Sequence, residues 1–410
     1  MGKCFHSGLV AKSFYSKKID CHTTCLRVSF SQYHNFITSV FLESLPNHIV
    51  IPLLMFKKSY TYRTTLNLLR SIVPLVVLFC NVCLWGCITE DMPPNTKQGN
   101  FEALWKIMDE HYCFFDYKKE EFGIDWDEVR NRYAPAISEG MSDEALFEVC
   151  AKMIGELRDG HVNLISAHDV ARYADWYEKY ATNFSDSLLR IYLGSSASYR
   201  IAASLRYKVL DGNIGYIRVP TFENAIGSGN ISQVMRYLAS CDGLIVDVRS
   251  NGGGLMTAAA DLAGIFINEP EVGGYICHKT GKGRNDFSAP WPIDITPASG
   301  LRWQKNAVIL TNRRTYSAAN SFVMFCKGLS HVVVMGDITG GGAGLPFTSS
   351  LPNGWSLRLS ACPMYDREMR LTEQGIEPDI YVSILAEDYA NGKDTMIEHA
   401  KNYLRSHSND

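Results

Sequence analysis

The chain has 410 residues, of which 46% are hydrophobic and 20% are charged. This composition supplies enough apolar material for one large or two medium globular domains and excludes a disordered protein. The formal net charge of -3 lacks the basic excess that a nucleic-acid-binding protein needs to neutralise phosphates. We therefore expect no nucleic-acid partner.

Residues 55–86 have the charge order of a signal peptide. The apolar run over residues 72–86 is about fifteen residues long, shorter than the roughly twenty that a spanning helix needs, which favours a cleaved signal over a permanent membrane helix. A buried hydrophobic helix is the alternative. Four basic residues precede the run: Lys57, Lys58, Arg63 and Arg70.

The stretch LWGC, which ends at Cys87, resembles the bacterial lipobox, in which the cysteine is acylated and becomes the mature amino terminus. This resemblance implies a protein anchored by lipid to a membrane of the bacterial cell envelope, with residues 87–100 as a tether. Cleavage without lipidation is the alternative. Residues 1–54 precede the signal, and we interpret them as a misassigned start or a leader.

The cysteines show no metal-ligand spacing. The sequence has 12 cysteines, and those from Cys87 onward are widely spaced, with no CxxC pair among them. Those in apolar surroundings, such as Cys150, are expected to be small buried hydrophobic residues. The sequence therefore predicts neither a metal site nor a cofactor, and it leaves the oligomeric state open.

Helical periodicity dominates residues 101–165. Phe101, Leu104 and Met108 fall on one helical face, and Leu146, with its neighbours at helical spacing, repeats the pattern behind a cap at residue 142 or 143. We predict a small helical domain here, followed by a connecting segment over residues 166–204. The aromatic residues of that segment could line a groove, although core packing is the simpler interpretation.

Strands and helices alternate over residues 205–390, the predicted core domain, and a helix is expected within residues 391–410. Apolar strands without polar interruption, separated by helices, predict an α/β fold with a largely parallel sheet covered by helices. The turn PNG at residues 352–354 predicts a hairpin. Strands are expected near residues 213–222, 242–250, 306–312 and 331–337, with helices near 231–241, 255–268 and 317–329.

Three glycine-rich or small-residue stretches follow predicted strands, where open α/β sheets place their sites. They are DVRSNGGG at 247–254, TYSAAN at 315–320 and GDITGGGAG at 336–344. Ser317 begins a predicted helix, so its oxygen would lie where unpaired N–H groups and the helix dipole favour negative charge. Within the first stretch, Asp247 and Arg249 are expected to form an internal ion pair that holds the glycine loop.

Together the three stretches resemble the serine peptidases that include the carboxy-terminal processing proteases, the tricorn core protease and the interphotoreceptor retinoid-binding protein. The resemblance implies a ClpP/crotonase-like core, a nucleophile at Ser317, and an oxyanion hole from the N–H groups of Gly253 and Ala318. It covers roughly residues 101–383. No stretch resembles the PDZ module of the processing proteases.

The general base separates two branches of this family. The processing proteases use a lysine about twenty-five residues after the serine, but that count reaches Gly342 here. The tricorn-like branch uses a histidine, and ELRDGHVNL places His161 at the matching position, with Asp159 available to hold its loop. A neutral imidazole is a suitable base near pH 7.

The resemblance also implies a carboxylate that orients the imidazole through a serine. Glu373 in LTEQGIEPDI is the candidate, although Thr372 occupies the expected position and Gly160 stands where the relaying serine would be. We therefore predict a serine endopeptidase acting on proteins or peptides. The rival interpretations are a noncatalytic protein that binds apolar ligands or peptides on the same scaffold, and an acyl-coenzyme A enzyme of the crotonase type.

Overall fold

The computed structural model describes residues 93–407. The expected leader, signal peptide and acylated Cys87 lie outside these residues. Within residues 93–407, no helix is long and apolar enough to cross a membrane, and no cluster of three or more His, Cys, Asp or Glu side chains could hold a metal ion.

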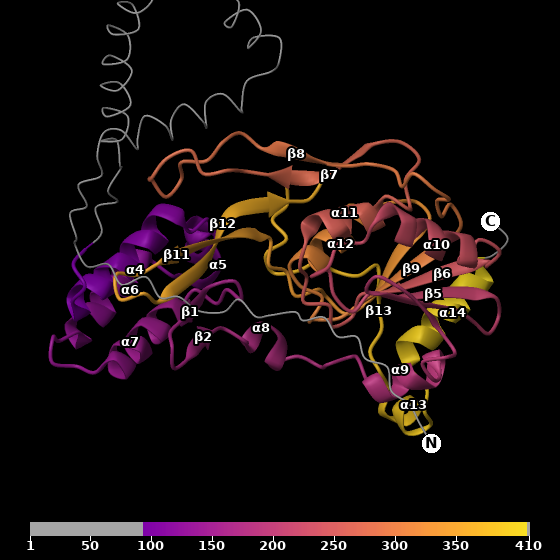
Figure 1. Cartoon of the computed structure of the whole chain (residues 1–410), viewed down its shortest axis with the longest axis horizontal. Coiled ribbons are helices and arrows are strands. Elements are labelled where there is room, and N and C mark those ends of the chain that lie inside the picture. The colour runs from indigo at the N-terminus through magenta and orange to yellow at the C-terminus, as the bar shows by residue number, and fades with distance from the viewer. Residues whose placement is uncertain (1–92, 408–410) are drawn as a thin grey trace, which may run out of the picture. The chain divides into compact units, whose positions relative to one another are not determined.

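The core domain is built on a seven-stranded sheet in the order β13-β10-β9-β6-β5-β4-β3. From β5 to β13 neighbouring strands are parallel, whereas β4 and β3 add antiparallel pairs at one edge. The parallel-rich sheet expected from the sequence is therefore confirmed (Figure 1). The strands are β3 Arg200–Ala202, β4 Leu205–Leu210, β5 Ile214–Arg218, β6 Gly243–Asp247, β9 Ala307–Thr311, β10 Val332–Gly336 and β13 Ile380–Tyr381.

Helices cover both faces of this sheet. On one face of the sheet, the side chains of Ile217, Val246 and Ile309 belong to one core cluster. The same cluster includes side chains of α10 Ser228–Leu238, α11 Met256–Ala263 and α12 Ala318–Cys326. A second cluster joins the opposite face to α9 Asp186–Leu193 and α14 Thr395–Ser406. Burial on both faces explains why β5, β6 and β9 are almost continuously apolar, with a polar residue only at the carboxyl end of each.

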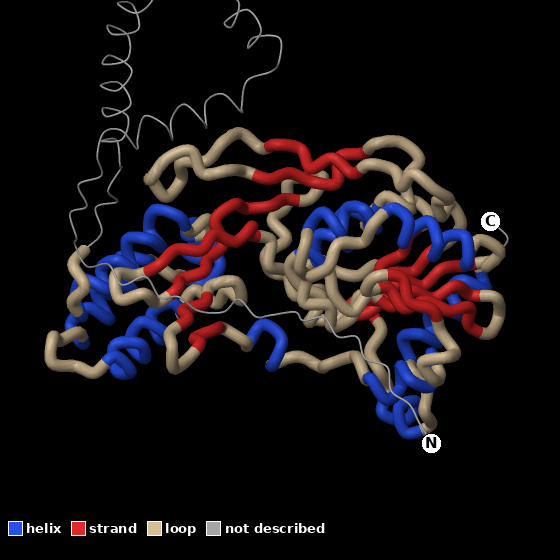
Figure 2. The backbone as a smooth tube through the Cα atoms, in the orientation of Figure 1, coloured by secondary structure: helices blue, strands red, loops and turns tan. Residues whose placement is uncertain are grey.

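A second, antiparallel sheet has the order β2-β1-β12-β7-β8, and β11 also pairs with β12 (Figure 2). The hairpin expected around the PNG turn is present as β11 and β12. β7, which pairs with β12, and β8, which pairs with β7, were not predicted, because β7 contains two glycines and β8 a proline, which weaken a strand pattern. The strands are β1 Asn163–Ile165, β2 Val170–Arg172, β7 Glu271–Ile276, β8 Trp291–Ile295, β11 Gly344–Ser350 and β12 Ser356–Tyr365.

The helical region does not have a core of its own. Its buried side chains form one cluster with Leu351, Leu357 and Leu359 of the hairpin, nearly two hundred residues later in the chain. Its first helix also begins at Lys97, capped by Thr96, inside the segment expected to be a tether. The helices are α4 Lys97–His111, α5 Phe115–Phe122, α6 Trp126–Tyr133, the short 3-10 turn Ala134–Ala136 and α7 Asp143–Gly155, which Ser142 caps as predicted.

Two further short helices lie outside these layers. α8 Asp175–Glu178 falls in the segment expected to connect the domains, and α13 Ala386–Ala390 precedes the last helix. The six described cysteines are all free thiols, and Cys150, Cys241, Cys277 and Cys326 are buried, as expected of small hydrophobic residues.

Candidate active site

The three glycine-rich or small-residue stretches meet at the carboxyl ends of β6, β9 and β10. The Ser250 N–H donates to Asn312 Oδ1 at 2.7 Å, and the Tyr316 N–H donates to the Asn251 carbonyl at 3.0 Å. The stretch at residues 336–344 is bonded to the stretch at residues 315–320, because the Ser317 N–H donates to the Gly341 carbonyl at 2.9 Å. Because the strands are parallel neighbours, loops far apart in the sequence are hydrogen-bonded into one surface.

Ser317 occupies the N-cap position of α12 but does not cap the helix. Its side chain accepts no hydrogen bond from the helix N–H groups, and its backbone has φ 56° and ψ -123°. A non-glycine residue in this region is strained by roughly 1–3 kcal/mol, and such strain is concentrated at functional sites. The hydroxyl instead faces an imidazole: Ser317 Oγ lies 3.1 Å from His161 Nε2.

His161 reaches the serine from the loop between α7 and β1. The side chain is buried, and its backbone N–H donates to Asp159 Oδ1 at 2.7 Å, so Asp159 holds the loop as expected. Asp159 is in turn fixed through Oδ2, which accepts hydrogen bonds from Tyr112 and from Ser360 of β12. The position of the imidazole therefore depends on the helical region and the antiparallel sheet together.

The imidazole is held by packing on its other side. Its ring centroid lies 4.9 Å from that of Tyr316, which stacks on Trp176 at 4.1 Å. Within residues 93–407, His161 Nδ1 has no hydrogen-bond partner. Burial lowers the pKa of His161 to about 4, only partly offset by Asp159. The ring is consequently neutral near pH 7 and can accept a proton from Ser317.

A cleft of about 680 Å³ opens over this pair. Its walls come from the His161 loop, the glycine loop after β6, the start of α12 and the hairpin of β11 and β12. Trp176 also lines it, so part of the aromatic segment faces the cleft rather than only the core. A peptide in this cleft would contact both the hydroxyl and the main-chain amides beside it.

Comparison with known proteins agrees with this geometry. The model of peptidase family S41 matches residues 213–382, and that of the tricorn protease C1 domain matches residues 93–155. A crystal structure of a candidate peptidase from Parabacteroides merdae is 45% identical, covers 76% of this chain and 97% of its own, and superposes with a TM-score of 0.71. The chain belongs to peptidase family S41.

S41 is a family of serine-type peptidases. The tricorn-like protease C-terminal subunit of Sulfurisphaera tokodaii is 27% identical over 192 residues, which cover 46% of this chain but only 20% of that relative. The chain thus matches about a fifth of that relative's length. Mature CPAF in complex with lactacystin shares the fold, with a TM-score of 0.59, 13% identity, and coverage of 77% of this chain and 99% of its own.

The site has no room for the lysine that a resemblance to the processing proteases would imply. Gly342 stands at that place with φ 75°, and a Cβ there would lie 2.5 Å from the Tyr316 ring. A lysine would need both a strained backbone and a displaced aromatic ring. The packing agrees with the sequence-based choice of His161 as the candidate base.

The serine relay of the tricorn-like branch is also sterically excluded. A Cβ at Gly160 would lie 2.5 Å from Trp176 Nε1 and 2.8 Å from the Tyr316 hydroxyl. The stacked aromatic pair fills the space that a relaying serine would occupy.

The sequence-based assignment of Glu373 as the group that orients His161 is wrong in this structure. Glu373 is buried, but Oε2 accepts the Ala343 N–H at 2.8 Å and Oε1 lies 3.8 Å from Lys118 Nζ. Burial raises the pKa of its carboxyl to about 8. Glu373 therefore holds the third glycine stretch in place, and Nδ1 of the imidazole is left without it.

The expected oxyanion hole needs a second correction. The Gly253 N–H already donates to Asn251 Oδ1 at 2.9 Å, whereas no acceptor for the Ala318 N–H is found within residues 93–407. Gly253 nevertheless has to be glycine: its φ is 97°, and a Cβ would lie 2.8 Å from both Ser317 Cβ and Ala318 N. Its role here is close approach to the nucleophile, and Ala318 is the available donor.

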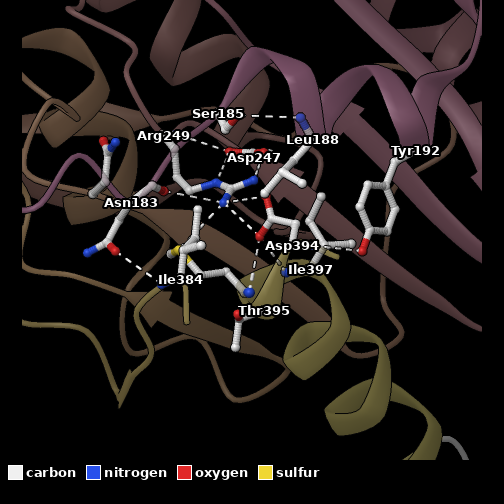
Figure 3. A network of polar contacts seen from close by, with 12 residues as sticks. Asn183, Ser185, Leu188, Tyr192, Asp247, Arg249, Ile384, Asp394, Thr395 and Ile397 are labelled. Atoms are coloured by element: carbon white, nitrogen blue, oxygen red, sulfur yellow. Dashed lines mark hydrogen bonds and ion pairs between the residues drawn. The ribbon is translucent and has the colours of Figure 1, made fainter. Parts of the chain in front are cut away.

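The predicted ion pair of Asp247 and Arg249 is confirmed, and it has a partner that the sequence did not reveal. Arg249 is fully buried and donates to both oxygens of Asp247, at 3.0 and 2.7 Å. It also donates to both oxygens of Asp394, which caps α14 (Figure 3). The glycine loop is thereby anchored to the last helix of the chain.

Proposed function

We propose that the protein is a serine endopeptidase in which Ser317 attacks a peptide carbonyl and His161 is the general base. The observation that carries the proposal is the 3.1 Å contact between Ser317 Oγ and His161 Nε2. The Ser317 side chain makes this contact and forms no capping hydrogen bond with α12. The two residues are 156 positions apart in the chain. A purely structural serine at this N-cap would be expected to bond the helix instead.

In the first step Ser317 Oγ forms a bond to the carbonyl carbon and passes its proton to His161 Nε2. The oxyanion of the tetrahedral intermediate accepts the Ala318 N–H, aided by the positive end of the α12 dipole. Collapse breaks the C–N bond, and the imidazolium returns the proton to the leaving amine. Water then repeats the sequence on the acyl-enzyme, with His161 taking the proton of the water.

The site acts as a dyad, because no described group accepts from Nδ1. Tyr316 and the Asp159-bound loop take over the positioning that an acidic residue provides in triads. The imidazolium formed during catalysis is less stabilised than in a triad, so a modest turnover is expected.

The proposal is tested with a fluorophosphonate probe and an unfolded protein substrate. Ser317→Ala should abolish both labelling and hydrolysis with an unchanged unfolding midpoint, and His161→Ala should suppress labelling of the intact serine. Absence of labelling in the wild type at any pH would support the noncatalytic binding protein instead.

We also propose that the protein is anchored to a bacterial envelope membrane by a lipid on Cys87, as the sequence order of basic residues, apolar run and cysteine suggests. Labelled fatty acid should be incorporated into the protein in its native host and lost in Cys87→Ser. Equal incorporation in both proteins would contradict the anchor.

A further inference from the structure

Two buried polar atoms at the active site have no hydrogen-bond partner, and they belong to neighbouring rings. They are His161 Nδ1 and Tyr316 Oη. Within residues 93–407, only six buried side-chain nitrogen or oxygen atoms lack a partner, and these two lie on rings whose centroids are 4.9 Å apart. Buried polar groups in native proteins are nearly always paired, so two adjacent exceptions at a functional site call for a physical explanation.

The Tyr316 hydroxyl lies on the Nδ1 side of the imidazole. Nε2 is the outer ring nitrogen and lies 3.1 Å from Ser317 Oγ, whereas Nδ1 is next to the carbon that joins the ring to its own backbone. The hydroxyl is close to that backbone, because a Cβ on Gly160, the residue before His161, would lie 2.8 Å from Tyr316 Oη. The two unpaired atoms are therefore on the same side of the ring, away from the nucleophile.

The tyrosine ring is fixed in place, but its hydroxyl hydrogen can turn. The ring stacks on Trp176, and a Cβ on Gly342 would lie 2.5 Å from Tyr316 Cζ. The backbone is held as well, since the Tyr316 N–H donates to the Asn251 carbonyl at 3.0 Å. A phenol can rotate its O–H about the C–O bond and offer a lone pair to a donor. Tyr316 Oη is thus a preplaced acceptor for an N–H of His161.

The surroundings keep this hydroxyl neutral. Burial raises the pKa of Tyr316 well above its usual value, and Asp159 and Glu373 raise it further. Two arginines, Arg358 and Arg313, act in the opposite direction without cancelling the effect. The phenol consequently keeps its proton throughout the working range of the site and can pair with the imidazole only as a neutral hydroxyl.

We propose that Tyr316 is a positioning residue for the charged base: as His161 takes the proton of Ser317, Nδ1–H donates a hydrogen bond to Tyr316 Oη. This inference rests on the proposed peptidase function and deepens it. No proton leaves Nδ1, and the phenol keeps its own. A hydrogen bond from a charged donor is about twice as strong as one between neutral groups, so this bond favours the imidazolium. Catalytic hydrogen bonds often tighten only as the reaction proceeds, which agrees with two adjacent atoms that are still unpaired in this structure.

A structural alternative is that Tyr316 only packs against the imidazole. The hydroxyl would then be a buried group without a partner, and its removal would leave turnover unchanged and stability unchanged or higher. The two roles differ in one oxygen atom. Tyr316→Phe separates them, because it keeps the ring and its stack on Trp176.

The kinetic test compares Tyr316→Phe with wild type on one quenched-fluorescence peptide. kcat should fall by roughly tenfold or more and KM should change by less than about twofold, because the lost bond is made to a charge that exists only after substrate is bound. Tyr207→Phe is the matched control: it removes a hydroxyl from another buried tyrosine, which packs on Tyr237. It should leave both constants unchanged. A kcat of Tyr316→Phe within about twofold of wild type would overturn the inference.

A spectroscopic readout separates this role from a general disturbance of the site. A peptide boronate forms a negatively charged tetrahedral adduct on Ser317 Oγ, which favours the protonated imidazole. In this adduct the pKa of His161, followed by nitrogen NMR of labelled histidine, should be lower in Tyr316→Phe than in wild type by about one pH unit or more. Equal pKa values in the two adducts would show that the hydroxyl does not bond the imidazolium, whatever the change in kcat.

Failure of the proposed function is recognised separately. If Ser317 reacts with neither the fluorophosphonate nor the boronate and no peptide is cleaved, the peptidase proposal fails. The inference is then read from the NMR titration of His161 in the unmodified proteins, where the hydroxyl should hold the pKa in wild type above that in Tyr316→Phe. Equal values there would refute the contact independently of any activity.

Discussion

The burial of His161 determines the lowest pH at which the site can work. An imidazole with the ordinary pKa of about 6.5 would be neutral in only about 3% of molecules at pH 5. With the pKa of His161 lowered to about 4 by burial, roughly nine-tenths of the molecules have a neutral base at that pH. Activity should therefore persist well below the range of a solvated histidine.

The assay is the pH profile of kcat/KM for a quenched peptide, with the rate of fluorophosphonate labelling of Ser317 as a second readout that does not involve peptide binding. Both should stay near their plateau down to pH 5 and fall about tenfold per pH unit below 4. An acid limb between pH 6 and 7 in both readouts would refute the reasoning, because it would show that the ring is solvated or paired with an anion.

The same burial affects stability with a defined sign. The pKa of His161 is lower in the folded chain than in the unfolded one, so the unfolded chain binds the proton first as the pH falls. The contribution of the neutral ring to the free energy of unfolding is fully present above pH 6.5 and is lost as the pH falls toward 4. At pH 5 the loss amounts to about 2 kcal/mol. Other groups, such as Glu373 with its raised pKa, also titrate in this range, so the test is the difference between two proteins. From pH 7 to pH 5, urea denaturation should show the free energy of unfolding changing by about 2 kcal/mol less favourably in wild type than in His161→Gln.

Three further predictions test the surroundings of the site. Gly253→Ala should lower kcat/KM by roughly a hundredfold or more, because the added Cβ collides with the nucleophile's own Cβ; near-normal turnover would contradict the geometry. Glu373→Gln should keep kcat/KM within about threefold, since the carboxyl does not contact His161, and a thousandfold loss would restore its orienting role. Asp394→Ala leaves Arg249 partly unpaired and should lower the free energy of unfolding by about 3–5 kcal/mol in urea denaturation; a loss below about 1 kcal/mol would show that the buried pair is not a major anchor.

Local patterns were sufficient to predict the elements of the core domain. The apolar strands after residue 205, the helices between them and the PNG hairpin are found near the expected positions, because their propensities and hydrophobic periods agree with their final burial. Elements with weak local signals were missed: β7 pairs with β12 and β8 pairs with β7, and the sequence gives no clue to either pairing.

Residue types and the family resemblance singled out Ser317 and His161 as candidates, and the fold brings their side chains to 3.1 Å from each other. The partners of these residues could not be predicted in the same way. Glu373 bonds Ala343, thirty residues before it in the chain, and the Gly253 N–H bonds the side chain of Asn251 within its own loop, and neither choice of partner follows from residue type or spacing.

The sequence by itself determined that this is an α/β protein with a serine at the start of a helix that follows a buried strand, glycine loops beside it and no lysine to serve as base. Only the tertiary structure decided that Tyr316 and Trp176 fill the places of the lysine and the relaying serine, and that Glu373 bonds Ala343 instead of His161. The physical reason is that hydrophobic period and turn chemistry act along the chain, whereas steric exclusion and charge pairing act through space, between residues that the fold alone brings together.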